Sequence, residues 1–421
     1  MVNSKVLMVC CSESGHSNVF LATAHALLKS HPSTELHIAS FKPLEKSITT
    51  SLKNVKSDFT PRFHLIDAPT TFEALNRDPD PFKRFNDVVL LPPGWQNIGK
   101  IMELFVRWMP LAWTVDEWTG IFWRIHGLIK ELEPALVVGD ALLGPGIAAA
   151  KHLREHENAA FKLAVLSPNS LKEFTQHLEG GTAAFAKWPL VGSALPMPIP
   201  WHLVPLNFYY LVRLILILTG KHHSNRELEL RKATGLPNVE LASMVTVMSQ
   251  NGAGLDHILL SSSPETDFPN LDYEAGPKEY RDRLVSCGPI LRSTSPVSEA
   301  DPELAQWLKG GPVVYINLGT LCMCSEGEAL ELAKSFRTLF DSASEKGIRV
   351  LWKLKKDTKR GPEYSTGSGS AIYGVIGKEM DEDRVRIVNW VNAEPASILM
   401  TGDVIVAINH GGASSYYEPI V

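Results

Sequence analysis

Residues 409–418 are the stretch of this chain whose types and spacing most clearly suggest chemistry. They read Asn-His-Gly-Gly-Ala-Ser-Ser-Tyr-Tyr-Glu and follow the apolar run 404–408. A parallel strand that leads into His-Gly-Gly and then into a helix presents free N–H groups and a positive helix end, where a phosphate can bind. Glu418, one turn later, could accept hydrogen bonds from paired hydroxyls such as those of a ribose. The alternative is that Ser415 and Glu418 only form a capping box.

A tryptophan stands upstream of this stretch. Trp390 follows Val388 and Asn389 at the end of an expected strand. Its indole ring offers a stacking face for a planar base. A stacking ring close to a phosphate site predicts a nucleotide-binding site.

A second candidate site lies near the N-terminus. The apolar run 5–11 is expected to be the first strand, and a helix is expected over about 19–29. His16 lies between them, after Gly15. In a doubly wound sheet this first turn opens into the ligand crevice at the carboxyl ends of the strands. His16 could therefore act on a substrate, and the alternative is a capping or surface histidine.

Asp140 is the candidate partner of His16, because it ends a second apolar run. An acid there faces the same crevice and could hold the imidazole in one tautomer. The alternative is a cap for a helix that begins near Pro145. The adjoining run 144–149 also fits the dinucleotide fingerprint G-x-G-x-x-A, but no acid ends the next strand, 161–167, as a ribose-binding unit requires.

The stretch 390–418 resembles the nucleotide-sugar signature of the UDP-glycosyltransferases, an inverting family with the GT-B fold, and its Gly-Gly-Ala-Ser-Ser wording is most similar to fungal members. The resemblance implies that Trp390 stacks on uracil and that Glu418 holds the ribose hydroxyls. It also implies that His16 and Asp140 form a catalytic pair. The remaining candidate UDP-sugar-binding residues are Gly15, Thr320, Val391, His410, Gly412, Ser414 and Ser415.

Thr320 belongs to a second Rossmann-like start. The apolar run 313–318 is followed by Gly319 and Thr320, and a helix is expected over about 326–344. The resemblance implies that Thr320 meets the diphosphate. The alternative is a loop hydroxyl that satisfies nearby backbone groups.

The fold class expected from these elements is α/β, because strand and helix signals alternate as parallel sheets require. The resemblance implies a GT-B architecture with two Rossmann-like domains. We place an N-terminal acceptor-binding domain at 1–291, a linker rich in Ser, Thr, Pro, Glu and Asp at 292–305, and a C-terminal nucleotide-sugar-binding domain at 306–421.

The second domain is expected to be incomplete, because family members continue past the glutamate with further strands and a helix. The run 404–408 is apolar on both faces and should be a partly uncovered edge strand. The chain could therefore be a catalytically inactive, truncated UDP-sugar-binding pseudoenzyme. The leading interpretation is a hexosyltransferase that moves a sugar from UDP to a hydroxyl of a small hydrophobic acceptor with inversion, uses His16 as general base and needs no metal or cofactor.

Composition limits the partners and the compartment. A net charge of −5 gives no reason to expect nucleic-acid binding. Five scattered cysteines indicate neither a zinc site nor a disulfide framework, which favours a reducing compartment such as the cytoplasm. The apolar run 203–218 is short for a membrane span and is interrupted by Arg213, so we expect a core or acceptor-lining helix, with peripheral membrane contact as the alternative.

Overall fold

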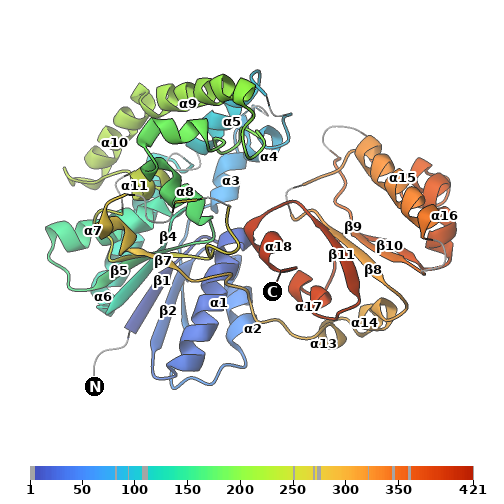
Figure 1. The fold of residues 1–421 in the computed structure, drawn as a ribbon. Coiled ribbons are helices and arrows are strands. Elements are labelled where there is room, and N and C mark those ends of the chain that lie inside the picture. Colours follow the sequence, from blue (N-terminus) through green and yellow to red (C-terminus); the bar gives the residue numbers. More distant parts are fainter. Residues whose placement is uncertain are drawn as a thin grey trace. The chain divides into compact units, whose positions relative to one another are not determined.

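The chain forms two compact units, Met1–Arg292 and Ser293–Val421, in a computed structural model (Figure 1). The structure describes residues 5–80, 83–92, 94–106, 112–249, 252–268, 271–272, 276–320, 322–343, 347–358 and 362–420.

The first unit is built on a seven-stranded parallel sheet with the order β3-β2-β1-β4-β5-β6-β7. The predicted doubly wound α/β arrangement is therefore confirmed, and the winding direction reverses between β1 and β4. Ligands bind at this reversal point in such sheets, beyond the carboxyl ends of the strands. The strands are β1 (Lys5–Val9), β2 (Glu35–Ser40), β3 (Arg62–Leu65), β4 (Leu136–Asp140), β5 (Lys162–Ser167), β6 (His257–Leu260) and β7 (Leu284–Ser286).

Helices cover this sheet, and two of those described, α3 and α6, begin with a complete capping box. Thr114 and Glu117 form a complete capping box at the start of α6, and Glu133 ends that helix in the left-handed conformation. The helices are α1 (Ser14–Ser30), α2 (Leu44–Leu52), α3 (Thr71–Asn76), α4 (Phe85–Val88), α5 (Ile98–Val106), α6 (Val115–Leu132), α7 (Gly144–His156), α8 (Leu171–Thr175), α9 (Val204–Leu218), α10 (Lys221–Thr234), α11 (Met244–Ser249) and α12 (Lys278–Arg281). Three short 3₁₀ helices join them, η3 (Gln176–Leu178), η4 (Gly181–Ala186) and η5 (Trp201–Leu203).

Two helices of this unit differ from the sequence prediction. Helix α1 begins at Ser14, five residues early, because the backbone carbonyl of Glu13 accepts from the N–H groups of His16 and Ser17. His16 therefore lies in the first helical turn. Helix α9 is not a core helix, since only 17% of the apolar segment Trp201–Leu218 is buried.

The second unit has a four-stranded parallel sheet with the order β10-β9-β8-β11. Apolar clusters on both faces of this sheet bury Trp352 and Leu351, so helices cover both sides. The strands are β8 (Val313–Asn317), β9 (Arg349–Lys353), β10 (Val385–Val388) and β11 (Val404–Asn409). The helices are α13 (Val297–Ala300), α14 (Pro302–Leu308), α15 (Glu326–Ser342), α16 (Ala371–Asp381), α17 (Pro395–Leu399) and α18 (Ala413–Tyr417).

The predicted linker is largely folded onto the second unit. Helix α13 and the first part of α14 fall within 292–305. Val297 and Leu304 are buried in the same apolar cluster as Tyr315. The polar composition that indicated a linker comes in part from helix capping: Asp301 is the N-cap of α14 and accepts from the N–H of Leu304.

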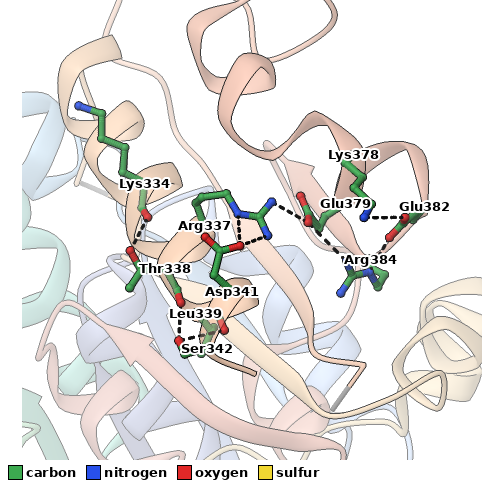
Figure 2. Close-up of polar contacts among 10 residues, drawn as sticks. All are labelled: Lys334, Arg337, Thr338, Leu339, Asp341, Ser342, Lys378, Glu379, Glu382 and Arg384. Carbon is green, nitrogen blue, oxygen red and sulfur yellow. Dashed lines mark hydrogen bonds and ion pairs between the residues drawn. The ribbon is translucent and has the colours of Figure 1, made fainter. Parts of the chain in front are cut away.

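A buried glutamate ties α15 and α16 together (Figure 2). Glu379 is 1% exposed, and its Oε1 accepts from Arg337 at 2.7 Å and from Arg384 at 3.4 Å. Arg337 also pairs with Asp341. A buried carboxylate is tolerated only when it is paired, so these two arginines fix α15, α16 and the start of β10 as one body.

Strand β11 is the edge strand of the second sheet, beside β8. Ile405, Val406 and Ile408 are 57%, 46% and 37% exposed. The predicted partly uncovered apolar strand is therefore confirmed. Such an edge invites pairing with another chain.

Candidate functional site

The carboxyl ends of β1 and β4 bring His16 and Asp140 together. These strands are parallel neighbours, with Val9 opposite Gly139, so Asp140 faces the turn that leads into α1. The Nδ1 atom of His16 lies 2.8 Å from Oδ1 of Asp140. Asp140 is fully buried, whereas the His16 side chain keeps 13% of its surface exposed. His16 is therefore neither the cap of α1, whose N-cap is Glu13, nor an exposed surface histidine.

Two backbone groups complete the environment of Asp140. The N–H of Cys11 donates to Oδ2 at 3.1 Å, and the N–H of Leu142 donates to Oδ1 at 2.9 Å. Burial alone would raise the pKa of Asp140, but His16 and these hydrogen bonds lower it below its usual value. The helix-cap alternative is wrong, because Leu143 stands at the N-cap of α7 without a side-chain cap.

The ionised carboxylate fixes the tautomer of His16. A carboxylate only accepts hydrogen bonds, so the proton belongs on Nδ1 of the imidazole. Nε2 is left with its lone pair, as a general base requires. Gly15, beside His16, has open space where a side chain would begin.

Glu13 is a neighbour of this pair that the sequence interpretation missed. Its Oε1 accepts from the N–H of Phe72 at the start of α3, at 2.9 Å. Its Oε2 is buried and has no hydrogen-bond partner among the described residues. Burial raises the pKa of Glu13, and the charges of Asp140 and His16 both act on it. In the sequence, Glu13 stands between Ser12 and Ser14, a pattern typical of a solvent-exposed turn. Its burial depends on α3, which packs against it.

Gly146, which belongs to the fingerprint-like run 144–149 and lies in the first turn of α7, serves packing, as does Gly139 of β4. A Cβ atom on Gly146 would lie 3.0 Å from Cγ1 of Val9, and one on Gly139 would lie 3.3 Å from Cγ1 of Ile147. Both distances are close to contact limits, so small residues let α7 rest against β1 and β4. This close contact accounts for the pattern without a nucleotide.

In the second unit, three neighbouring strands end in one row of polar residues. Asn409, Asn317 and Lys353 occupy the same register at the carboxyl ends of β11, β8 and β9. Oδ1 of Asn317 accepts from Gly319 N–H at 3.1 Å, and Oδ1 of Asn409 accepts from Gly411 N–H at 2.8 Å. Both glycines have positive φ, +77° and +74°. The chain therefore makes the same asparagine-glycine turn twice, side by side.

His410 belongs to the second turn, and its ring lies against Gly319 of the first. A Cβ on Gly319 would come within 2.6 Å of Cε1 of His410, and one on Gly412 within 2.5 Å of Nε2. The glycines thus leave room for the imidazole. Burial and then Lys353 lower the pKa of His410, so the ring is uncharged at neutral pH. Thr320 is exposed after the first turn, and its carbonyl accepts from Lys355 at 2.7 Å.

Trp390 follows β10 by two residues and is 66% exposed. The Nζ atom of Lys353 lies 4.6 Å from the centre of its ring, a cation–π contact. Burial and then Lys355 lower the pKa of Lys353. Lys353 was missed because the sequence shows only a cluster of lysines after a strand. Val391 packs against the apolar cluster of α14 and α17, so a ligand would meet its backbone.

Helix α18 begins at Ala413, with Gly412 at its N-cap and no side-chain cap. The capping-box alternative for Ser415 and Glu418 is therefore wrong. Ser414 lies in the first turn, and its carbonyl accepts from the N–H of Glu418 at 2.8 Å. Ser415 and Glu418 line a small cavity that Tyr315, Asn317, Pro395, Leu399, Ala407, Ile408, Asn409 and Pro419 complete. Trp390 does not line this cavity.

Metal ligands do not gather in the part of the chain that the structure describes: no group of three or more His, Cys, Asp or Glu residues there could hold an ion. The five cysteines all lie in that part, and none of them forms a disulfide. That the reaction needs no metal stays a prediction.

Comparison with known proteins decides the family. The chain is 30% identical to glycosyltransferase sdnJ of Sordaria araneosa, over 98% of this chain and 77% of the relative. This chain belongs to the glycosyltransferases. The predicted membership of the UDP-glycosyltransferase family is thereby confirmed at the level of family and fold. No sequence-family profile matches the glycosyltransferase.

Solved structures agree on the GT-B fold of this glycosyltransferase. TcCGT1 in complex with UDP aligns with a TM-score of 0.55 and 16% identity, over 99% of this chain and 79% of that one. The glycotransferase of kitacinnamycin aligns with a TM-score of 0.52 and 14% identity, over 100% of this chain and 78% of that one. UDP-glucose:anthocyanidin 3-O-glucosyltransferase in complex with UDP aligns with a TM-score of 0.53 and 14% identity, over 99% of this chain and 78% of that one. At such identities the likeness concerns the fold alone.

Proposed function

We propose that this glycosyltransferase moves a hexosyl group from a UDP-sugar to a hydroxyl of a small hydrophobic acceptor, with inversion at the anomeric carbon. The observation that carries the proposal is the His16–Asp140 pair at the reversal point of the first sheet. A buried carboxylate that holds an imidazole with its second nitrogen free is the arrangement that general-base catalysis needs.

The reaction is a single displacement. Nε2 of His16 takes the proton from the acceptor hydroxyl while that oxygen attacks the anomeric carbon. The bond from this carbon to the diphosphate oxygen breaks on the opposite face, so the configuration inverts and UDP leaves with the bonding electrons. Asp140 stabilises the imidazolium that forms. Glu13, close to the pair and with one oxygen unpartnered among the described residues, is placed to orient the acceptor.

The second unit supplies the donor site in this proposal. Uracil stacks on the face of Trp390 that Lys353 leaves open, and Glu418 accepts from the ribose hydroxyls. Lys353 and an uncharged His410 lie at the row of strand ends where a diphosphate carries its charge. We assign the remaining contacts with the UDP-sugar to Gly15, Thr320, Val391, Gly412, Ser414 and Ser415. Two of the structural neighbours were solved in complex with UDP, which supports this donor.

The compartment and the cofactor need follow from the same residues. We propose a cytoplasmic enzyme, because none of the described cysteines forms a disulfide and two of them, Cys10 and Cys11, are buried beside the catalytic pair. In this proposal Lys353 takes the place of a metal at the diphosphate. Turnover should therefore continue in EDTA.

The test is a donor panel. The full chain is incubated with UDP-glucose, UDP-galactose, ADP-glucose or GDP-mannose and a set of hydroxylated aromatic acceptors, with and without EDTA, and products are measured by mass spectrometry. We expect transfer from UDP-sugars only, and NMR should show inverted configuration at the new bond. Equal use of ADP-glucose would refute the role of Trp390, and retained configuration would refute the single displacement.

A further inference from the structure

Helix α9 presents an apolar stripe to the outside of the first unit. Tyr209, Val212 and Leu216 follow one another at helical spacing and are 44%, 51% and 62% exposed. Trp201, just before the helix, is 85% exposed. The segment Trp201–Leu218 has a mean hydropathy of 1.5, and apolar surface of this extent marks an interaction site. Figure 1 shows α9 at the margin of the unit, with α10 and α5 beside it.

The opposite side of α9 is fixed to the unit. Asn207 is fully buried, accepts from the N–H of Leu190 at 2.9 Å, and donates to the carbonyls of Phe185 and Trp188 at 2.7 and 2.8 Å. Tyr210 is buried on the same side. The helix cannot leave the unit without breaking these hydrogen bonds. By length and composition the segment could cross a membrane, but an anchored helix must lie flat with its stripe outward.

The charged side chains of the chain segment that carries the stripe are of one sign. No aspartate or glutamate occurs from residue 180 to residue 226, whereas this stretch contains Lys187, Arg213, Lys221 and Arg226. Lys187 pairs with Glu179 and Arg226 with Glu229. Arg213 and Lys221 are exposed, and the guanidinium of Arg213 lies against α5, 2.7 Å from where a Cβ of Gly99 would be. Cations that flank an apolar helical face complement anionic lipid headgroups.

We propose that α9 is an interfacial membrane anchor: it lies in the headgroup layer of an anionic bilayer, with Trp201, Val212 and Leu216 in the acyl boundary and Arg213 and Lys221 among the phosphates. The catalytic pair takes no part in this contact, so the proposal stands independently of the proposed function. Its consequence is that the first unit works at a membrane surface, where hydrophobic acceptors concentrate.

The experiment is vesicle co-sedimentation of the full chain. Vesicles of phosphatidylcholine, with or without phosphatidylserine, are mixed with wild type, with the double variant Val212→Ser/Leu216→Ser, and with Arg213→Gln. Phe59→Ser is the matched control, because Phe59 is 47% exposed in the segment before β3 and carries the same apolar-to-serine change. Thermal unfolding checks that each variant is folded, and sedimentation velocity without lipid reports self-association.

We expect wild type and Phe59→Ser to bind phosphatidylserine vesicles alike and to lose binding in high salt. The double variant should bind at least about 10-fold more weakly, because it withdraws two apolar side chains from the bilayer. Arg213→Gln should bind several-fold more weakly to anionic vesicles only. Equal binding of the double variant and Phe59→Ser, or equal binding to neutral vesicles, would overturn the proposal. Dimerisation through the stripe with no vesicle binding would overturn it in favour of a second copy as the occupant.

Discussion

Replacing Asp140 with asparagine should uncouple the base from its orienting group without changing the size of the side chain. The carboxylate accepts three hydrogen bonds, from His16, Leu142 and Cys11. An asparagine has one acceptor oxygen. If that oxygen keeps the hydrogen bonds from His16 and Leu142, the amide N–H₂ faces the N–H of Cys11. If the amide is flipped, the N–H₂ faces Nδ1 of His16 and forces the proton onto Nε2.

Both orientations have a cost that can be estimated. A buried donor left without an acceptor destabilises the folded state by about 1–3 kcal/mol. The flipped amide gives the wrong tautomer, and turnover should fall by about 10²–10⁴-fold, within the range that a general base contributes. UDP affinity should not change, because Asp140 belongs to the first unit, whereas the residues assigned to uracil, ribose and diphosphate belong to the second.

The pH dependence has a definite sign. The pKa of Asp140 is lowered in the folded protein, so its carboxylate contributes stability above the unfolded pKa, which is about 3.9. This contribution is lost as the pH falls through the folded value. Wild type should therefore exceed Asp140→Asn in stability at neutral pH, and the difference should shrink as the pH falls below about 4.

The assay combines urea unfolding at several pH values, calorimetry with UDP, and turnover of UDP-glucose. Asp256→Asn is the matched control, because Asp256 also accepts a strand N–H, that of Leu163, and pairs with Arg154 and Lys162. We expect the control to lose stability but to keep its turnover per folded molecule. Turnover of Asp140→Asn within about threefold of wild type, a free-energy change under 1 kcal/mol, would refute the role given to Asp140.

Four further changes test the second unit. Trp390→Ala should weaken UDP binding several-fold or more, since stacking adds about 0.5–1.5 kcal/mol beyond area burial. An unchanged UDP affinity in calorimetry would contradict this. Lys353→Met should weaken UDP binding and make it less sensitive to salt, and an unaltered salt dependence would remove Lys353 from the diphosphate. Gly319→Ala should displace His410, because the new Cβ would lie 2.6 Å from Cε1 at a φ of +77°; both Tm and UDP affinity should fall, and retention of both would show that the turn is not needed. Ile405→Lys should raise the soluble yield by charging the exposed edge of β11, and an unchanged yield would show that this edge does not drive association.

The general fold followed from the sequence because its signals are local. Apolar runs that end in Gly-His, in Asp140 and in Gly319-Thr320 each gave a strand and the start of a helix, and parallel strands place such ends on one edge. The proximity of His16 and Asp140 followed from the same rule. The register that places Asn317, Asn409 and Lys353 in one row depends on pairing between distant strands, which no local pattern shows.

The differences between the sequence interpretation and the structure have tertiary causes. The predicted linker is polar, yet the apolar residues Val297 and Leu304 are buried in the second core. The 203–218 run was expected to be a core or acceptor-lining helix, and the core interpretation fails because only its Asn207 side is enclosed, by α5 and η4. Glu13 was overlooked because its burial depends on α3, which is remote in sequence.

The most direct test of the central claim separates chemistry from donor binding at His16. His16→Ala and the control His25→Ala, from the same helix, are compared with wild type for UDP-glucose turnover and for UDP affinity by calorimetry. We expect turnover of His16→Ala to fall by about 10²–10⁴-fold while UDP affinity stays unchanged and His25→Ala matches wild type. Preserved turnover in His16→Ala, or loss of UDP binding in that variant, would contradict the assignment of His16 as the general base.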